Sequence, residues 1–260
     1  MRTLLISGGS SGIGKATVEY FARKGWMVYE LSRHGVSREN VVHTDCDVTD
    51  EQSVRRAVAA VLRQTDRLDV VIANAGFGIS GTIEFTATED VRHQFDVNFF
   101  GALHLAKAVL PKLREQHGGT IIFTSSVAAI LAVPYQAFYS ATKAAINAMA
   151  LALQNEVRDF GIHVSVLMPG DVQTGFTAAR NKSAAGEDVY LSAHKAVATM
   201  EHDEQHGLCP EQMALCFWRI ANKHHPAPQY VGGGSYKMLC FLDRLLPKRL
   251  VNWIEYKVYS

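Results

Sequence analysis

The sequence predicts an α/β fold of the doubly wound type, in which helices cover both faces of a mostly parallel sheet. Short apolar runs alternate with longer segments of helical period up to about Pro169, and that alternation is typical of βαβ units. A glycine-rich turn follows the first apolar run. The chain has 260 residues, of which 48% are hydrophobic, and this size fits one large domain. We therefore expect a single domain over residues 1–260.

The expected elements follow one another without a repeat or a linker. The apolar runs TLLIS, WMVYELS, VVHTD, LDVVIAN, GTIIFTSS, IHVSVLMPG and QYVGGG predict strands at residues 3–7, 26–32, 41–45, 68–74, 119–126, 162–170 and 229–234. Segments of helical period predict helices at residues 14–25, 51–65, 89–116, 138–160 and 210–223. In this order, helical segments connect successive strands of the sheet.

Two segments depart from the alternation. Residues 171–208 have a mixed composition with weak helical stretches, and a long irregular segment in a compact domain is usually functional or mobile. We expect it to be a substrate lid. The tail, residues 236–260, alternates apolar and basic positions, and Pro247 should split it into two short helices. Such a tail suits a helix lying in a membrane surface; alternatively, its apolar face packs over the substrate cleft or a partner subunit.

Composition excludes several classes of protein. The formal net charge is +1 with acids and bases mixed along the chain, so no basic surface for nucleic acid is expected. The four cysteines, Cys46, Cys209, Cys216 and Cys240, show no paired spacing, which favours reduced thiols in a cytoplasmic setting. The N-terminal run MRTLLISGG is too short for a signal-peptide core or a spanning helix.

The stretch SGGSSGIG, Ser7 to Gly14, lies where the first strand turns into the first helix. Its glycines, Gly8, Gly12 and Gly14, would allow a tight turn, a close approach to a phosphate and close helix packing. The spacing departs from the dinucleotide fingerprint GxGxxG, so a turn without a ligand is the alternative. Its position after an N-terminal strand favours nucleotide binding.

The end of the second strand indicates which nucleotide binds. An acidic residue there would bind the adenosine ribose of NAD, whereas a basic one would receive the 2′-phosphate of NADP. The strand ends in Ser32 and Arg33, and Glu30, two residues before Ser32, should point to another side. A guanidinium suits phosphate, so the sequence favours NADP over NAD. The alternative is a solvated surface arginine.

Tyr139 and Lys143 in the stretch YSATK are four positions apart on an expected helix and therefore share one face. An ammonium beside a phenol favours the phenolate and makes proton exchange with an alcohol or carbonyl oxygen feasible. Taken alone, such a pair is more often ordinary helix surface. Ser125 and Ser126 end the preceding strand, at the sheet edge where ligands bind, and a serine hydroxyl there could hold a substrate oxygen.

Several ordered motifs together resemble the short-chain dehydrogenase/reductase family: SGGSSGIG, DCDVTD, ANAG, DVNFFG, TSSVAA, YSATK and PGDVQT. The resemblance covers about residues 2–175 and implies a Rossmann-type fold with a seven-stranded sheet. It also implies that Tyr139 is the catalytic acid/base, that Ser126 orients the substrate oxygen, and that Lys143 binds the nicotinamide ribose and lowers the tyrosine pKa. Asn98 in DVNFFG would hold a water in the proton relay.

The same resemblance implies the cofactor contacts. These are Gly8, Ser10, Ser11, Gly12, Ile13, Gly14, Ser32 and Arg33, with Asp47 and Val48 at the adenine, Asn74, Ala75 and Gly76 along one wall, Pro169, Gly170, Val172 and Thr174 near the nicotinamide amide, and Tyr139 and Lys143 at its ribose. Asp47 could instead cap a helix, and Gly76 and Pro169 could simply end strands.

The departures from the family pattern are few. Ser7, Ala73 and Ala129 replace the usual threonine, asparagine and glycine, and none of them removes a catalytic group. Ser11 stands where some NADP-dependent members carry a basic residue. The prediction of NADP therefore rests largely on Arg33.

We expect an oxidoreductase that transfers a hydride between NADP(H) and a secondary alcohol or ketone. Val133, Phe138, Phe176 and Tyr190 suggest an apolar pocket for a steroid, retinoid or long-chain carbonyl. The alternative is a non-catalytic dinucleotide-binding sensor or scaffold, although such a protein would not need the intact serine, tyrosine, lysine and asparagine.

Assembly and metal binding complete the expectations. Family members often pair through the helices expected at residues 89–116 and 138–160, so a homodimer or homotetramer is expected. The histidine pairs His202 with His206 and His224 with His225 have no carboxylate at a recognisable spacing that would complete an open metal site, and hydride transfer needs no metal. They are interpreted as surface residues, and no metal is expected.

Overall fold

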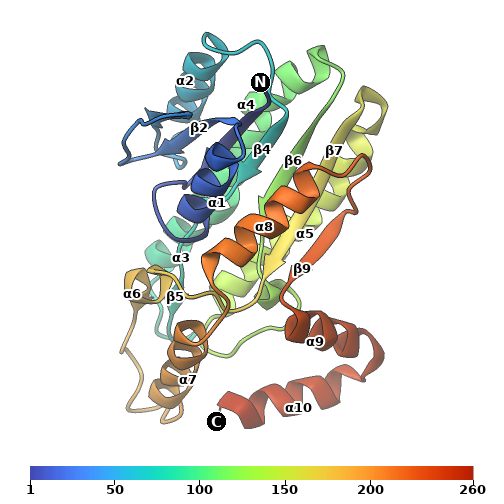
Figure 1. Ribbon diagram of the computed structural model, residues 1–260. Helices are drawn as coiled ribbons and strands as arrows, with labels where there is room; N and C mark the ends of the chain where they lie inside the picture. The colour runs from blue at the N-terminus through green and yellow to red at the C-terminus, as the bar shows by residue number, and fades with distance from the viewer. Residues whose placement is uncertain (260) are drawn as a thin grey trace.

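A seven-stranded parallel sheet forms the centre of the computed structural model, which describes residues 1–259 (Figure 1). Its strands are β1 (Thr3–Ser7), β2 (Met27–Ser32), β3 (Val41–Asp45), β4 (Val70–Ala73), β6 (Gly119–Thr124), β7 (Ile162–Pro169) and β9 (Gln229–Gly232). They lie in the order β3-β2-β1-β4-β6-β7-β9, and every neighbouring pair is parallel. The predicted doubly wound fold and its seven strands are confirmed.

The strand order reverses between β1 and β4. From β1 the chain builds outward to β3, then returns to the other side of β1 and builds outward from β4 to β9. In open parallel sheets ligands bind beyond the carboxyl ends of the strands at this reversal. The glycine-rich turn follows β1 directly, so the topology brings it to that point.

Helices cover both faces of the sheet. One face carries α1 (Gly12–Arg23) and α8 (Pro210–Ala221), which pack against each other and lie nearest the viewer in Figure 1. The opposite face carries α2 (Glu51–Leu62), α4 (Gly101–Glu115) and α5 (Ala137–Glu156). The two layers enclose separate apolar cores on the two sides of the strands.

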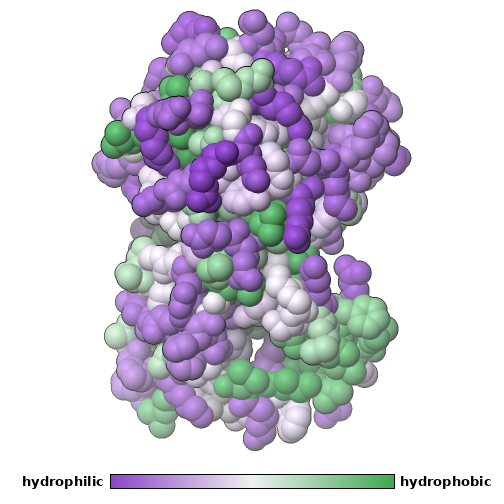
Figure 2. Space-filling view, in the orientation of Figure 1, coloured by the Kyte–Doolittle hydropathy of each residue, from purple (hydrophilic) through white to green (hydrophobic). Residues whose placement is uncertain are grey.

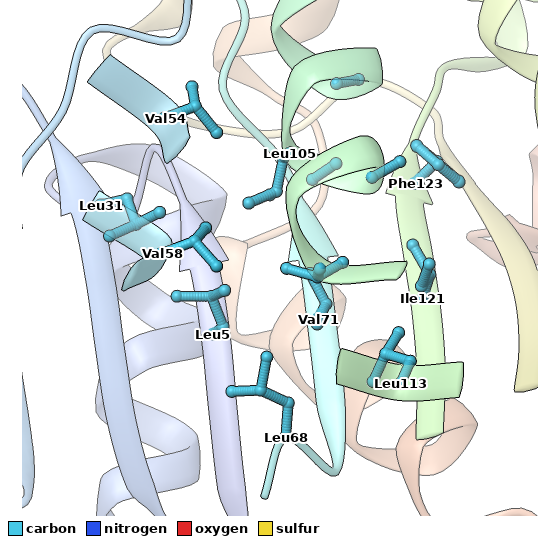
Figure 3. Close-up of a cluster of buried hydrophobic side chains, with 14 of the residues drawn as sticks. Leu5, Leu31, Val54, Val58, Leu68, Val71, Leu105, Leu113, Ile121 and Phe123 are labelled. Carbon is cyan, nitrogen blue, oxygen red and sulfur yellow. The ribbon is translucent and has the colours of Figure 1, made fainter. Parts of the chain in front are cut away.

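The strands supply both cores because successive side chains point to opposite faces. Leu5 and Val71 pack with Val58 of α2 and Leu105 of α4 (Figure 3), while the neighbouring Ile6 packs on the side of α1 and α8. The central strands are therefore apolar at consecutive positions. Burying each such side chain contributes roughly 1.5–3 kcal/mol relative to exposure.

The helix expected at residues 89–116 is interrupted. It consists of α3 (Thr88–Phe95), a π-helical turn η1 (Asp96–Phe100) and α4. The buried Asn98 lies in that turn, and its side chain forms hydrogen bonds with the backbone of Phe77. A contact between distant parts of the chain therefore occurs where the α-helix is interrupted. The helix expected at residues 138–160 is α5 followed by a 3₁₀ turn at Arg158–Phe160.

The segment 171–208 contains α6 (Phe176–Ala179), β8 (Asn181–Lys182) and α7 (Ala193–Gln205). β8 pairs with β5 (Ile79–Ser80) in a small second sheet that the sequence did not suggest. The tail forms α9 (Gly234–Leu245) and α10 (Lys248–Tyr259), and the expected break at Pro247 is confirmed. These elements lie beyond the carboxyl ends of the main strands (Figure 1). Among the described residues, no helix combines the length and apolar character needed to span a bilayer.

Candidate active site

A cavity of about 920 Å³ opens at the carboxyl ends of the strands, within the size range of small-molecule sites. The glycine-rich turn and the loops after β2, β4 and β6 line one part of it. Residues 169–176, α7, α9 and α10 line the other part. One continuous cavity therefore joins the expected cofactor region to residues 171–208 and to the tail, residues 236–260.

Most of the predicted site residues line this cavity. They are Gly8, Ser10, Ser11, Gly12, Ile13, Ser32, Arg33, Asp47, Val48, Asn74, Ala75, Gly76, Ser126, Tyr139, Lys143, Pro169, Gly170, Val172 and Thr174. Gly14 and Asn98 are the two predicted residues that do not line it. Both lie behind the wall and contact groups that do.

The glycine-rich turn has a backbone that only small residues fit. Gly8 has φ of +68° and a Cβ there would lie 2.7 Å from the Cα of Ala75, while Gly12 has φ of +51°. A Cβ on Gly14 would lie 2.0 Å from the carbonyl oxygen of Gly8, so Gly14 lets α1 pack against the turn.

The N-terminus of α1 faces this turn with its backbone N–H groups unsatisfied by a side-chain cap. Ser11 is the N-cap residue of this helix and has an extended backbone conformation. Its side chain makes no capping hydrogen bond. Free N–H groups at a helix N-terminus favour an anion. The residues present therefore fit the pyrophosphate of a dinucleotide.

Ser7 and Asn74 connect β1 and β4 at the reversal of strand order. The Ser7 hydroxyl accepts hydrogen bonds from the backbone N–H groups of Asn74 and Ala75 at 3.1 and 3.3 Å. The Asn74 amide donates to the Gly8 carbonyl at 3.1 Å. Ser7, in place of the usual threonine, therefore keeps the hydroxyl that fixes the backbone of Asn74 and Ala75 in the cavity wall.

Glu30 lies beneath the turn and does not line the cavity. Its Oε1 accepts from the Gly9 N–H at 3.0 Å, and its Oε2 is 2.5 Å from Nδ1 of His43. Arg33 is exposed and lines the cavity beyond the end of β2. Arg33 rather than Glu30 therefore lines the cavity.

Asp47 lines the cavity at the end of β3, where its carboxylate accepts from the backbone N–H and the hydroxyl of Thr49. The backbone hydrogen bond from Thr49 is the main cause that lowers the pKa of Asp47. Asp50, not Asp47, caps α2, because its carboxylate accepts from the N–H of Gln52 at 2.8 Å. The helix-cap interpretation of Asp47 is therefore wrong.

Tyr139 and Lys143 lie on one face of α5, with Nζ of Lys143 5.6 Å from the centroid of the Tyr139 ring. Lys143 is buried and donates to the carbonyl of Thr124 at 2.9 Å. The hydroxyl of Ser125 donates to the Lys143 carbonyl at 3.1 Å. These two bonds fix α5 against the end of β6, where Ser126 lies.

Burial changes the pKa values of both groups. It raises the pKa of Tyr139 to about 12, while a hydrogen bond with Ser126 lowers that pKa to a smaller extent. Desolvation lowers the pKa of Lys143 to about 8. The expected lowering of the tyrosine pKa by Lys143 is not found, because removing water from the phenolate is the larger effect. Tyr139 therefore carries its proton at neutral pH.

Asn98 is fully buried behind the cavity wall. Its amide donates to the carbonyl of Phe77 at 3.0 Å and to the hydroxyl of Thr142 at 3.1 Å, and its Oδ1 accepts from the N–H of Phe77. π-Helical turns are frequent at functional sites. Asn98 connects this turn to α5, next to the lysine.

Two of the four residues expected to form an apolar pocket line the cavity. Val133 and Phe176 line the cavity, and the Phe176 ring centroid lies 5.6 Å from that of Tyr139. Phe138 and Tyr190 do not line it. Phe138 precedes Tyr139 on α5 and so points about 100° away from it. The Tyr190 hydroxyl instead donates to Glu84 at 2.8 Å.

Histidine and acidic side chains form no metal site within residues 1–259, where no group of three or more potential ligands occurs. His202 and His206 have ring centroids 4.2 Å apart on α7, and the ring of His206 bonds the carbonyl of His202. The imidazole of His206 is therefore hydrogen-bonded to a backbone carbonyl of its own helix.

Sequence reasoning missed several polar residues on the second part of the cavity: Asp171, Asp203, Glu204, Tyr236, Asp243, Glu255 and Tyr259. Asp171 directly follows Pro169 and Gly170, so its position after a strand was a usable signal. The others lie in segments without a motif, where only the packing of helices brings them to the cavity.

The fold agrees with that of known proteins. Residues 2–185 match the family described as short chain dehydrogenase. The chain is 39% identical to the 3-ketodihydrosphingosine reductase of Bacteroides thetaiotaomicron over 231 residues, 86% of this chain and 84% of that protein. It is 30% identical to the probable short-chain type dehydrogenase/reductase VdlC of Helicobacter pylori over 258 residues, 96% of this chain and 94% of that protein.

A solved short-chain dehydrogenase from Streptomyces avermitilis superposes with a TM-score of 0.84 at 26% identity, covering 98% of this chain and 97% of the other. The chain belongs to the short-chain dehydrogenase/reductase family and is an oxidoreductase.

Proposed function

We propose that the protein reduces an apolar long-chain ketone to a secondary alcohol with NADPH. The convergence of Tyr139, Lys143 and Ser126 on a cavity that also contains the glycine-rich turn carries this proposal. Bound in that cavity, the reduced nicotinamide would supply the hydride for the carbonyl carbon. The protein would supply position and the proton.

Each residue has one role in this proposal. The Ser126 hydroxyl holds the carbonyl oxygen, and the Tyr139 hydroxyl gives that oxygen its proton. Lys143 holds the nicotinamide ribose with its ammonium group. Asn98 acts from behind the wall, where it orients α5 through Thr142 and supports the water relay that returns a proton to Tyr139.

The protonation state of Tyr139 is compatible with carbonyl reduction. Burial raises that pKa to about 12, so the phenol is protonated at neutral pH and can act as an acid. Carbonyl reduction requires an acid, whereas alcohol oxidation requires the phenolate as a base.

Arg33 supports NADPH as the cofactor. Arg33 is exposed and lines the cavity beyond β2, whereas the carboxylate of Glu30 does not line it. The other proposed cofactor contacts are the residues that the family resemblance implies. Of these, Gly14 would act indirectly, because it lets α1 pack against the glycine-rich turn. Gly8, Gly12 and the N-terminus of α1 receive the pyrophosphate.

An apolar substrate is supported by the second part of the cavity, where α9 and α10 contribute leucine, valine and isoleucine side chains. The relative from Bacteroides thetaiotaomicron is named for a keto substrate. Of the steroid, retinoid and long-chain carbonyl classes, we therefore favour the long-chain carbonyl. Residues 171–208 act as a lid over it, within a single catalytic domain.

We also propose that the outer face of α9 and α10 rests on an anionic membrane surface. Figure 2 shows apolar side chains gathered where these helices lie. Met238, Phe241 and Leu245 form an exposed stripe on α9, and Trp253 is exposed on α10. Lys237, Arg244, Arg249 and Lys257 flank this surface, which suits anionic lipid.

Pairing of subunits through α4 and α5 is supported by a small-residue face. Ala141, Ala144, Ala148 and Ala152 are exposed along α5 and would let a second helix approach closely. The unpaired cysteines support a reducing, cytoplasmic setting for this homodimer or homotetramer.

Loss of NADPH absorbance with long-chain ketones tests the proposal. The wild-type protein should turn over, and Tyr139→Phe should lose at least about 10²-fold in kcat while binding NADPH nearly as before. Tyr20→Phe, on α1 where the ring packs against Trp218 away from the cavity, is the matched control and should stay active. Ser126→Ala should also be severely impaired. A protein that binds NADPH but reduces no ketone would instead be the sensor or scaffold, and near-normal turnover by Tyr139→Phe would refute the mechanism.

A further inference from the structure

The substrate part of the cavity combines an apolar wall with carboxylates. Leu239, Leu242, Val251, Ile254 and Val258 come from the inner sides of α9 and α10. Into the same space face the acidic side chains of Asp171, Asp203, Glu204, Asp243 and Glu255. An apolar cavity for a neutral ketone has no need of these charges.

Cationic partners already occupy two of these carboxylates. Glu204 forms an ion pair with the buried Arg180 and accepts from the hydroxyl of Thr177. Asp243 forms an ion pair with Lys248, with Nζ 2.6 Å from Oδ1. Both are therefore neutralised by the protein itself.

Asp171 differs from them. Its Oδ2 accepts a hydrogen bond from the hydroxyl of Tyr236 at 2.5 Å, and no lysine, arginine or histidine of residues 1–259 forms an ion pair with it. It is half-buried, and its desolvation raises its pKa. The charge of Arg180 acts on Asp171 without forming an ion pair with it. A partly desolvated carboxylate without an ion-pair partner is unfavourable, so a bound cation would stabilise it.

The position of Asp171 connects it to the reaction. It follows Pro169 and Gly170 at the carboxyl end of β7, the same sheet edge at which Ser126 follows β6. The charge of Asp171 acts on the hydroxyl of Tyr139. Because Asp171, Ser126 and Tyr139 line the same cavity, a cation held by Asp171 would share that cavity with the carbonyl that Tyr139 protonates.

We propose that Asp171 binds an ammonium group of the substrate, and that the preferred substrate is a long-chain ketone with an amino group near its carbonyl. This inference rests on the proposed function and adds to it a residue that determines specificity. The apolar wall of α9 and α10 takes the hydrocarbon chain, Ser126 and Tyr139 take the carbonyl oxygen, and Asp171 takes the ammonium. Tyr236 holds the carboxylate in place.

The same charges exclude other long-chain ketones. Asp203 and Glu255 add negative charge to this part of the cavity, so a substrate with a carboxylate or phosphate near its carbonyl is repelled. A neutral ketone would bind but would leave Asp171 without a cation. The inference thus separates three substrate classes of equal chain length.

Matched substrates test it. The ratio of kcat/KM for a long-chain 2-amino-3-ketone to that for the same ketone lacking the amino group is measured with NADPH near pH 7. The wild-type ratio should be high, and Asp171→Asn, which keeps the size and the bond to Tyr236, should lower it about tenfold or more. Asp188→Asn removes an exposed charge that does not line the cavity and should change the ratio less than about threefold.

Two outcomes separate this inference from the proposed function. If the wild-type protein reduces both ketones equally well, or if Asp171→Asn leaves the ratio unchanged, the inference is overturned while the reductase stands. If neither ketone is reduced, the proposed function fails.

If Asp171→Asn has no activity, a binding measurement replaces the kinetic one. A simple long-chain alkylamine then competes with an apolar fluorophore bound in the cavity, and the affinity of the amine is measured. Wild-type protein should bind the amine more tightly than Asp171→Asn by a similar factor, and equal binding would overturn the inference.

Discussion

Arg33 is the residue on which the choice of cofactor depends. Arg33 is exposed and lines the cavity beyond the end of β2, so its guanidinium is accessible to a 2′-phosphate. Arg33→Ala should weaken NADPH binding by about 1–3 kcal/mol and NADH binding much less. Calorimetry with both cofactors measures this. Arg38→Ala, which removes an exposed arginine paired with Glu19, is the control, and equal losses for the two cofactors would exclude the role of Arg33.

Lys143 should give cofactor binding a pH dependence. Desolvation lowers its pKa to about 8, so its ammonium group is present below that pH and is lost as the pH rises through it. Affinity for NADPH should therefore fall above about pH 8, by up to about tenfold per pH unit. Tyr139, with a pKa of about 12, does not titrate there.

Fluorescence titration of NADPH between pH 6 and pH 9.5 measures this dependence. Lys143→Met should bind weakly at every pH in that range and show no fall at high pH. The same fall in the Lys143→Met variant would assign it to another group.

At the scale of elements, α9 and α10 have two apolar sides. One side lines the cavity, and the other exposes Phe241 and Trp253 at 60% and 57%. The two interpretations of the tail, as a cover for the cleft and as a membrane contact, are therefore compatible, because different faces of the same helices would serve them.

The membrane contact predicts flotation with anionic vesicles. The wild-type protein should float, whereas the double variant Phe241→Gln and Trp253→Gln should remain in solution with its soluble activity largely kept. Val36→Gln, which changes an apolar residue that is 77% exposed in the β2–β3 loop, should float as the wild type does. Flotation of the double variant, or its absence in the wild type, would refute the contact.

At the scale of the whole molecule, the exposed alanine face of α5 predicts subunit pairing. Light scattering at micromolar concentration should give at least twice the monomer mass of 28.6 kDa. Ala148→Arg should lower the mass, because a long charged side chain separates closely packed helices. Ala198→Arg makes the same change on α7 and should not lower it. A wild-type mass near that of the monomer would contradict pairing.

The sequence by itself determined the features that local patterns encode. Alternating apolar and helical segments predicted the seven strands, because the spacing of apolar side chains reflects the geometry of each element. The glycine-rich turn and the four-residue spacing of Tyr139 and Lys143 likewise depend only on nearby residues. Their common location follows from the rule that ligands bind beyond the carboxyl ends of parallel strands.

Only the tertiary structure decided the features that depend on contacts between distant segments. Asn98 interrupts a helix that its local sequence favours, because its side chain bonds Phe77 and Thr142. Burial, not the neighbouring lysine, governs the pKa of Tyr139. Asp171 meets Tyr236 across 65 positions of chain. Such contacts depend on how α7, α9 and α10 pack over the sheet edge, and no periodicity along the chain encodes that packing.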